Sequence, residues 1–392
     1  VPIVNIAAPN ASGLSHNQYQ QYNVGTQGVI LNNATDRTQS TQLGGIILGN
    51  QNLNGRAAST ILNEVIGANA TQLKGYTEVA GQAARVIVAN PYGISCNGCG
   101  FINTPQVTLT TGKPVLDNGR LDHFRVDSGS VSIDGGGLNA DNVDQFDIIT
   151  RSAKINAELH AKKLNIVTGR NDVDAQTLND TALADDGSAK PQLAIDSSAL
   201  GGMYAGAIRL VGTEAGVGVK LAGNLAASAG DIQIDANGQL IMAQVAANGA
   251  VNVKAASADV QGAMYGNSVD LQTRDALNIQ QNIAARDRIS LSSNGQLTNN
   301  AIVEAGVNAD NSRNARGDVA LSAQNLRNNG TVIASRDLSA KTSQSLDNSG
   351  RQITAGDNLA LNVQGTLNNQ SGLISAGGAG LAGLHLQRRR PA

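Results

Sequence analysis

The second half of the chain contains Leu338-Ser-Ala-Lys, Leu346-Asp-Asn-Ser-Gly and Ile353-Thr-Ala, and 21 residues later it contains Leu359-Ala-Leu-Asn, Leu367-Asn-Asn-Gln-Ser-Gly and Ile374-Ser-Ala. Apolar and polar side chains alternate within these segments, which is the period of a β-strand with one buried face. The residues between the strands are mostly Asn, Asp, Gly and Ser, which favour tight corners. This stretch therefore predicts a repeating unit of two or three short strands.

The same strand pattern recurs through the second half at a nearly constant spacing. The strands begin at Ile232, Val251, Val269, Ile289, Val319, Leu338 and Leu359, with spacings of 19, 18, 20, 30, 19 and 21 residues. The spacing of 30 includes an additional polar stretch, residues 308–316. Units that each bury only a few aliphatic side chains must stack on their neighbours to be stable. The sequence predicts an all-β fold, a right-handed parallel β-helix, as one continuous rod.

The composition agrees with a thin aliphatic interior. The 392 residues are 41% hydrophobic but only 2% aromatic, with 45 Gly and a net charge of −2. A chain with so little net charge lacks the strongly basic surface with which proteins bind nucleic acid or anionic membranes. No apolar run approaches the roughly 20 residues that span a bilayer.

The first half follows the same pattern less regularly. Its expected strands begin at Val107, Val131, Leu164 and Ile208, with wider spacings. The polar stretch 169–191 is expected to form a hairpin or loop outside the helix. Residues 1–40 are expected to form a β cap, because the first coil of a β-helix would otherwise expose its strand edges. The tail, residues 381–392, departs from the repeat and is expected to mark a truncation.

Two longer segments in the first half identify a family. They are Gly75-Tyr-Thr-Glu-Val-Ala-Gly81 and Val86-Ile-Val-Ala-Asn-Pro-Tyr-Gly-Ile-Ser-Cys-Asn-Gly-Cys-Gly-Phe-Ile-Asn-Thr104. Together with Tyr22-Asn-Val-Gly, Gly28-Val-Ile-Leu-Asn-Asn-Ala34, Gly201-Gly-Met-Tyr-Ala and Val211-Gly-Thr-Glu-Ala-Gly-Val-Gly-Val219, they resemble the two-partner secretion (TPS) domain of filamentous haemagglutinin-like exoproteins. The Cys-x-x-Cys sequence is most similar to the CdiA-type contact-dependent growth-inhibition proteins. The resemblance covers residues 1–235, and residues 236–380 resemble haemagglutinin-type repeats.

The resemblance implies a role in two-partner (type V) secretion. The chain would be the N-terminal secretion and folding-nucleation domain of a large cell-surface exoprotein. It would cross the periplasm of a Gram-negative bacterium and be recognised by the POTRA domains of a cognate CdiB-type transporter of the Omp85 family. The toxin of such proteins lies at the far C-terminus, and contact with the target-cell surface would use distal regions that are not in this chain. This chain is therefore expected to be a monomer without enzymatic activity or cofactor.

The resemblance also indicates candidate residues for transporter recognition. The signature tetrapeptides of the family are Asn-Pro-Asn-Leu and Asn-Pro-Asn-Gly. They correspond here to Asn50, Gln51, Asn52 and Leu53, where glutamine replaces the proline, and to Asn90, Pro91, Tyr92 and Gly93. The second tetrapeptide also fits a β-turn with proline at its second position, so turn formation alone could explain these residue types.

Cys96 and Cys99 are the only cysteines. In the oxidising periplasm that the resemblance implies, they are expected to form a structural disulfide. Free thiols, half of a zinc site and a redox motif are the alternatives. A zinc site needs two further ligands, yet the four histidines, His16, His123, His160 and His385, lack ligand spacing. A redox pair favours a helix N-terminus, whereas the adjacent glycines indicate a corner. No metal site is expected.

Two other functions compete with secretion. The first is an adhesin, a haemagglutinin rod that binds host or bacterial surface glycans. Sugar binding often uses aromatic faces, and three Phe, six Tyr and no Trp offer few of them. The second is a polysaccharide lyase or hydrolase, which needs a carboxylate cluster or a metal-assisted base. The expected strands present mainly Gln, Asn, Ser and Thr outward, which disfavours an enzyme.

Overall fold

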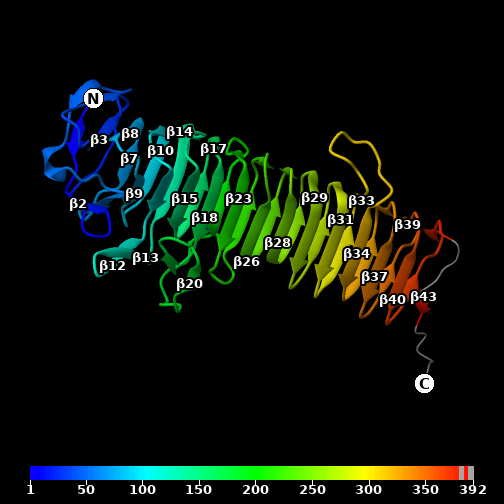
Figure 1. The fold of residues 1–392 in the computed structure, drawn as a ribbon. Helices are drawn as coiled ribbons and strands as arrows, with labels where there is room; N and C mark the ends of the chain where they lie inside the picture. The colour runs from blue at the N-terminus through cyan, green and yellow to red at the C-terminus, as the bar shows by residue number, and fades with distance from the viewer. Residues whose placement is uncertain (379–383, 387–392) are drawn as a thin grey trace. The chain divides into compact units, whose positions relative to one another are not determined.

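The computed structural model describes residues 1–378 and 384–386, in two units comprising residues 1–219 and residues 220 onward. Each unit consists mainly of short strands that pair in parallel with strands of the next coil, as Figure 1 shows by the stacked arrows. Each unit is therefore a parallel β-helix, the predicted fold.

The second unit contains three columns of parallel strands. The first column aligns Ile232 with Val251, Val251 with Val269, and so on through Ile289, Val319, Leu338 and Leu359. The repeat predicted from sequence is thus confirmed at the level of individual residues. Its strands are β25 (Leu225–Ala227), β26 (Ile232–Met242), β27 (Val245–Ala247), β28 (Ala250–Val260), β29 (Met264–Thr273), β30 (Leu277–Ile279), β31 (Ile283–Ser293), β32 (Gln296–Asn299), β33 (Ile302–Ala305), β34 (Asp318–Ala323), β35 (Asn325–Asn328), β36 (Thr331–Ala334), β37 (Leu338–Thr342), β38 (Leu346–Asp347), β39 (Gln352–Ala355), β40 (Leu359–Val363), β41 (Leu367–Asn368), β42 (Leu373–Ala376) and β43 (Leu384–Leu386).

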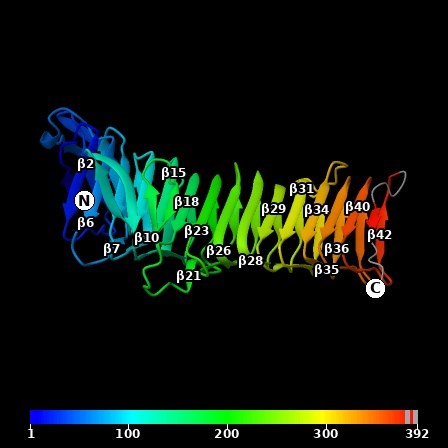
Figure 2. The same ribbon diagram turned by 90° about the horizontal axis from the view of Figure 1, so that it is seen from below.

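A ladder of asparagines runs along one corner of this unit. The side-chain amide of Asn299 donates to Asn328 (3.0 Å), that of Asn328 to Asn348 (2.8 Å), and that of Asn348 to Asn369 (2.8 Å). The first three of these side chains are buried, and a buried amide must find a partner. The ladder explains why Leu-x-Asn recurs at this corner. Figure 2 shows the unit from below, where β35 and β36 of the other two columns come into view.

The first unit also contains three columns. One column passes through β2, β6, β9, β11, β15, β18 and β23, and the other two share the long strands β10 and β14. Phe101 and Phe146 meet inside the coils with ring centroids 5.8 Å apart. The strands in these columns are β1 (Ile3–Asn5), β2 (Leu14–Tyr19), β3 (Val29–Asn33), β6 (Thr60–Val65), β7 (Thr71–Leu73), β8 (Tyr76–Gly81), β9 (Arg85–Ala89), β10 (Ile94–Ile102), β11 (Gln106–Thr110), β14 (Ser130–Ala140), β15 (Gln145–Thr150), β16 (Ser152–Ile155), β17 (Leu159–Ala161), β18 (Lys163–Thr168), β21 (Leu193–Ser197), β22 (Met203–Ala205) and β23 (Ala207–Gly212), and β24 (Gly218–Leu221) spans the unit boundary in the sequence.

The predicted cap, residues 1–40, contains three strands that pair in parallel, β1, β2 and β3. β1 pairs with β3, and β2 pairs with β6 of the following coil. A short antiparallel hairpin of β4 (Thr38–Thr41) and β5 (Gly45–Leu48) follows. The N-terminus therefore uses the pairing of the helix itself, with the hairpin as an addition.

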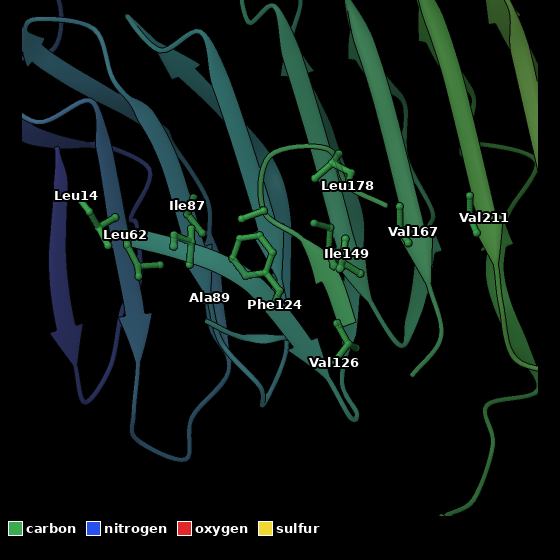
Figure 3. Packing of buried hydrophobic residues seen from close by; sticks show 13 residues of the cluster. Leu14, Leu62, Ile87, Ala89, Phe124, Val126, Ile149, Val167, Leu178 and Val211 are labelled. Carbon is green, nitrogen blue, oxygen red and sulfur yellow. The ribbon is translucent and has the colours of Figure 1, made fainter. Parts of the chain in front are cut away.

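A four-stranded antiparallel sheet covers one outer face of the first unit. Its strands are β12 (Lys113–Asp117), β13 (Arg120–Val126), β19 (Asn171–Asp174) and β20 (Asp180–Ala182). The predicted hairpin in residues 169–191 is confirmed as β19 and β20, whereas the hairpin of β12 and β13 was not predicted. Figure 3 shows the cluster beneath the sheet, in which Phe124 lies between Ile87 and Ile149 of the helix strands. This cluster is a second core, outside the coils.

The predicted tail, residues 381–392, lies outside the described residues except for β43, which pairs with β40. No helix in the described part of the chain is long and apolar enough to cross a membrane.

Candidate functional site

The first tetrapeptide forms a single 3-10 turn, η1 (Gln51–Leu53), with Asn50 as its N-cap. The Asn50 side chain accepts from the backbone N–H of Asn52 (3.0 Å) and donates to the carbonyl oxygens of Ile6 and Asn32 (both 2.9 Å). Asn50 and Leu53 are buried, whereas Gln51 and Asn52 are exposed. Asn50 thus ties the chain after β1 to β3.

This turn lines a groove of about 1010 Å³ between β1 and the β4–β5 hairpin. Three large apolar side chains of the groove face solvent: Ile3 is 47% exposed, Ile46 78% and Leu48 74%. Among the described strands, β1 pairs with β3 only. No strand therefore covers its second edge, where the Asn52 side-chain amide donates to the carbonyl oxygen of Asn5 (3.3 Å). The groove combines an open strand edge with apolar side chains, a combination that favours association with another strand.

The second tetrapeptide is a β-turn, as its residue types predicted. The N–H of Gly93 donates to the Asn90 carbonyl oxygen (3.1 Å), and that of Tyr92 donates to the Asn90 side chain (2.9 Å). Asn90 is fully buried, and its amide donates to the Asn69 carbonyl oxygen (2.8 Å). Gly93 has a φ of +114°, a conformation that L side chains rarely adopt. Tyr92, in contrast, is 59% exposed.

The second tetrapeptide lines a different pocket from the first. This pocket has a volume of about 530 Å³, and Ile66, Tyr92 and Pro114 contribute to its walls. Four of the eight candidate side chains therefore face solvent, those of Gln51, Asn52, Pro91 and Tyr92. Asn50, Leu53, Asn90 and Gly93 are buried and shape the local backbone.

The structure joins Cys96 and Cys99 by a disulfide with a Cα–Cα distance of 5.5 Å. Both side chains are buried, and Gly98 between them has a φ of +74°. Cys96 pairs with Ile133 and Cys99 with Leu138 of β14, with a register shift between them. The disulfide therefore staples the corner at which β10 passes from one column to another.

Removing this disulfide is expected to lower the free energy of unfolding by about 2 kcal/mol. The loss is at the low end for a disulfide because the closed loop is only a few residues long, so closing it removes little entropy from the unfolded chain. The variant is Cys96→Ala/Cys99→Ala in the 392-residue chain, measured by urea denaturation. The parent chain in reducing buffer is the control and should lose a similar amount. Equal stability of the double variant and the oxidised parent would contradict a stabilising role.

A buried ion pair holds the outer sheet, and sequence reasoning missed it. The Asp147 carboxylate is fully buried and accepts from Gln106 (2.8 Å), Thr108 (2.9 Å), Gln145 (2.9 Å) and Asn165 (3.1 Å). Arg85 Nη2 lies 4.0 Å from Asp147 Oδ2 and donates to Thr108 Oγ1 (2.9 Å).

The second guanidinium nitrogen of Arg85, Nη1, donates to the carbonyl oxygen of Ala175 (2.7 Å), directly after β19. Burial lowers the pKa of Arg85, and the charge of Asp147 opposes that shift. The Asp147 carboxylate is fully buried and accepts four side-chain hydrogen bonds beside the Arg85 guanidinium, an arrangement typical of a structural cluster. The signal for it is a charged residue at the start of β9, a strand that is buried at every position.

Within residues 1–378 and 384–386, no group of three His, Cys, Asp or Glu side chains is arranged to hold a metal ion.

Comparisons with known proteins bear on the family. The sequence model of the TPS secretion domain matches residues 1–242. The 16S rRNA endonuclease CdiA of Enterobacter cloacae is 46% identical over 388 residues, which cover 95% of this chain and 12% of that protein. The tRNA nuclease CdiA of Yersinia mollaretii is 43% identical over 389 residues, covering 95% and 13%. The chain thus spans only about an eighth of these relatives.

Among solved structures, the crystal structure of the filamentous hemagglutinin secretion domain is 34% identical, with a TM-score of 0.59. The match covers 77% of this chain and 94% of that chain. With a parallel β-helix and a family match over its first 242 residues, the chain belongs to the TPS secretion domain family and is similar to the CdiA-type exoproteins.

Proposed function

We propose that this chain acts as the secretion and folding-nucleation domain of a large CdiA-type exoprotein. Its partner is a cognate outer-membrane transporter of the Omp85 family, of the CdiB type, that binds it through periplasmic POTRA domains. The exoprotein crosses the periplasm of a Gram-negative bacterium and reaches the cell surface. The match to the TPS secretion domain over residues 1–242 is the observation that supports this proposal.

The groove beside β1 is the surface that best suits the transporter. An extended strand of a POTRA domain could pair with the open edge of β1, and main-chain hydrogen bonds would then supply affinity. Ile46 and Leu48 would cover the apolar side of the POTRA strand. Gln51 and Asn52 lie at the polar end of the groove. Tyr92 and Pro91 form a second, smaller contact surface.

We also propose that the chain is not itself an enzyme. The nuclease activities in the names of the relatives belong to those proteins, of which this chain matches only 12–13%. The buried carboxylate Asp147 is enclosed by its own partners rather than open to a substrate.

Charged residues in the groove are expected to weaken transporter binding. Ile46→Asp/Leu48→Asp should reduce capture of the chain by the purified POTRA region of the cognate transporter roughly tenfold or more, because apolar burial is lost. Leu200→Asp is the matched control, since Leu200 is 77% exposed in the same unit but outside this groove.

Two results would contradict these proposals at different levels. Full binding by the groove variant would reject the groove while leaving the partner intact. No binding of the parent chain to the POTRA region would reject the partner itself. Tyr92→Ala tests the second surface in the same assay.

A further inference from the structure

The polar insertion in the second unit, residues 306–317, forms a loop of defined shape. Figure 1 shows it as the yellow loop that extends from the sheet beside β33. Val307 and Arg313 form an antiparallel bridge across it, and Asn311 at its tip has a φ of +67°. The Asn314 amide donates to the carbonyl oxygen of Arg286 (3.0 Å) and to Asn308 (2.9 Å). The loop is thus braced both internally and against the helix.

A pocket of about 310 Å³ lies between this loop and the outer face of β27, β29, β31 and β33. Tyr265 of β29 is central to it, because in register it faces Ala246 on one neighbouring strand and Ala284 on the other. Its hydroxyl donates to the carbonyl oxygen of Val307 (2.9 Å). Val307 lies just after β33, the strand of this column that is two coils further along the chain than β29.

This hydrogen bond determines the direction of the aromatic ring. To reach Val307, the Tyr265 side chain must extend along the stacking direction across the coil that holds Ala284, and a methyl group is small enough to leave it room. Tyr265, Ala246 and Ala284 together make an apolar platform in the pocket, and Ile302, which is 42% exposed, also lines it.

Polar side chains surround this platform. Arg313 makes two hydrogen bonds to Glu304, from Nε to Oε2 (2.7 Å) and from Nη2 to Oε1 (3.2 Å). Gln244, Asn282 and Asn311 also line the pocket. Arg313 Nη1 donates to the carbonyl oxygen of Asn311 (2.6 Å), and the Asn282 side chain accepts from the backbone N–H of Ile302 (3.0 Å). Donors and acceptors are therefore fixed around an apolar floor.

We propose that this pocket binds one pyranose ring of a glycan. A sugar ring has an apolar C–H face, which suits an aromatic and methyl platform, and a rim of hydroxyl groups, which suits carboxylate, guanidinium and amide partners. The volume lies at the lower end of small-molecule sites, about 300 Å³, and suits a single ring. In repeat proteins, insertions on one face commonly form the binding surface. The site is independent of the secretion function.

Saturation-transfer NMR on the full chain tests this site, with glucose, galactose, mannose and N-acetylglucosamine as probes. Transfer to the ring protons of at least one sugar is expected, and Tyr265→Ala should weaken its binding about tenfold. Tyr204→Ala is the matched control, because Tyr204 of β22 also faces outward but stacks on His160, with centroids 5.2 Å apart. Arg313→Ala provides a second variant that leaves the platform intact and should weaken binding severalfold.

The proposal is overturned if none of the four sugars receives saturation. It is also overturned if Tyr265→Ala and Arg313→Ala both bind as the parent does, or if Tyr204→Ala reduces binding as much as Tyr265→Ala. Circular dichroism of each variant reports whether it is folded. If Tyr265→Ala does not fold, the sugar binding of Arg313→Ala decides whether the proposal stands.

Discussion

Residues 236–378 alone are expected to remain inside cells that export the 392-residue chain through the cognate transporter. Both proteins would carry the same cleavable signal peptide and be produced with the same transporter. The repeats lack the groove beside β1 and the two tetrapeptides, so nothing in them would engage the POTRA domains. Immunoblots of medium and cell fractions should show the repeat protein in the medium only at the level of a strain without transporter.

Residues 1–242 alone provide the matched control, because they comprise the region that matches the TPS secretion domain. They should reach the medium as the full chain does. Export of residues 236–378 at a level comparable to that of residues 1–242 would contradict the assignment of secretion to the first half. Failure of both fragments, with export of the full chain, would instead show that both halves are needed.

The fold of the second unit could be predicted almost residue by residue. Each coil repeats the same local pattern, so Ile289, Val319 and Leu338 are aligned by sequence spacing and also by strand pairing. The insertion at 308–316 was visible as an excess of residues. The pocket beside this insertion could not be predicted from the sequence, because the hydrogen bond from Tyr265 to Val307 links residues 42 positions apart.

The outer sheet of the first unit could be predicted only in part. Polar residues indicated the hairpin of β19 and β20. The sequences of β12 and β13, in contrast, have an alternation of apolar and polar residues that also fits strands of the β-helix itself. The clearest signal was in the strands they cover. β9 is buried at all five positions, and Val86-Ile-Val-Ala has the continuous apolar character of a strand with both faces covered.

The candidate site shows the same limit. The residue types of the tetrapeptides predicted a turn at Asn90, but the burial of Asn50 depends on the carbonyl oxygens of Ile6 and Asn32, which lie 44 and 18 positions away. The exposed Ile46 and Leu48 lie on a hairpin for which the sequence shows no repeat. Long-range contacts of this kind leave no periodic trace.

Asp147→Ala is expected to lower the free energy of unfolding by about 3–5 kcal/mol, because it leaves the buried Arg85 guanidinium without its counter-charge. The four side chains that donate to Asp147 would also lose their acceptor. Urea denaturation of the 392-residue chain measures the loss. Hydrogen exchange at β19 and β20 should accelerate more than exchange in the second unit, since Arg85 also holds the backbone at Ala175.

Two further variants separate the charge effect from a general loss of packing. Arg85→Met/Asp147→Leu removes both charges, and it should recover much of the stability because apolar residues of similar size often replace a buried ion pair without loss. Asp141→Ala, at an exposed carboxylate of the same unit, should leave stability near that of the parent. If the double variant were no more stable than Asp147→Ala, the loss would come from the hydrogen bonds of Asp147 rather than from the unpaired cation. In that case the carboxylate would act mainly as the shared acceptor that aligns β11, β15 and β18 beneath the outer sheet.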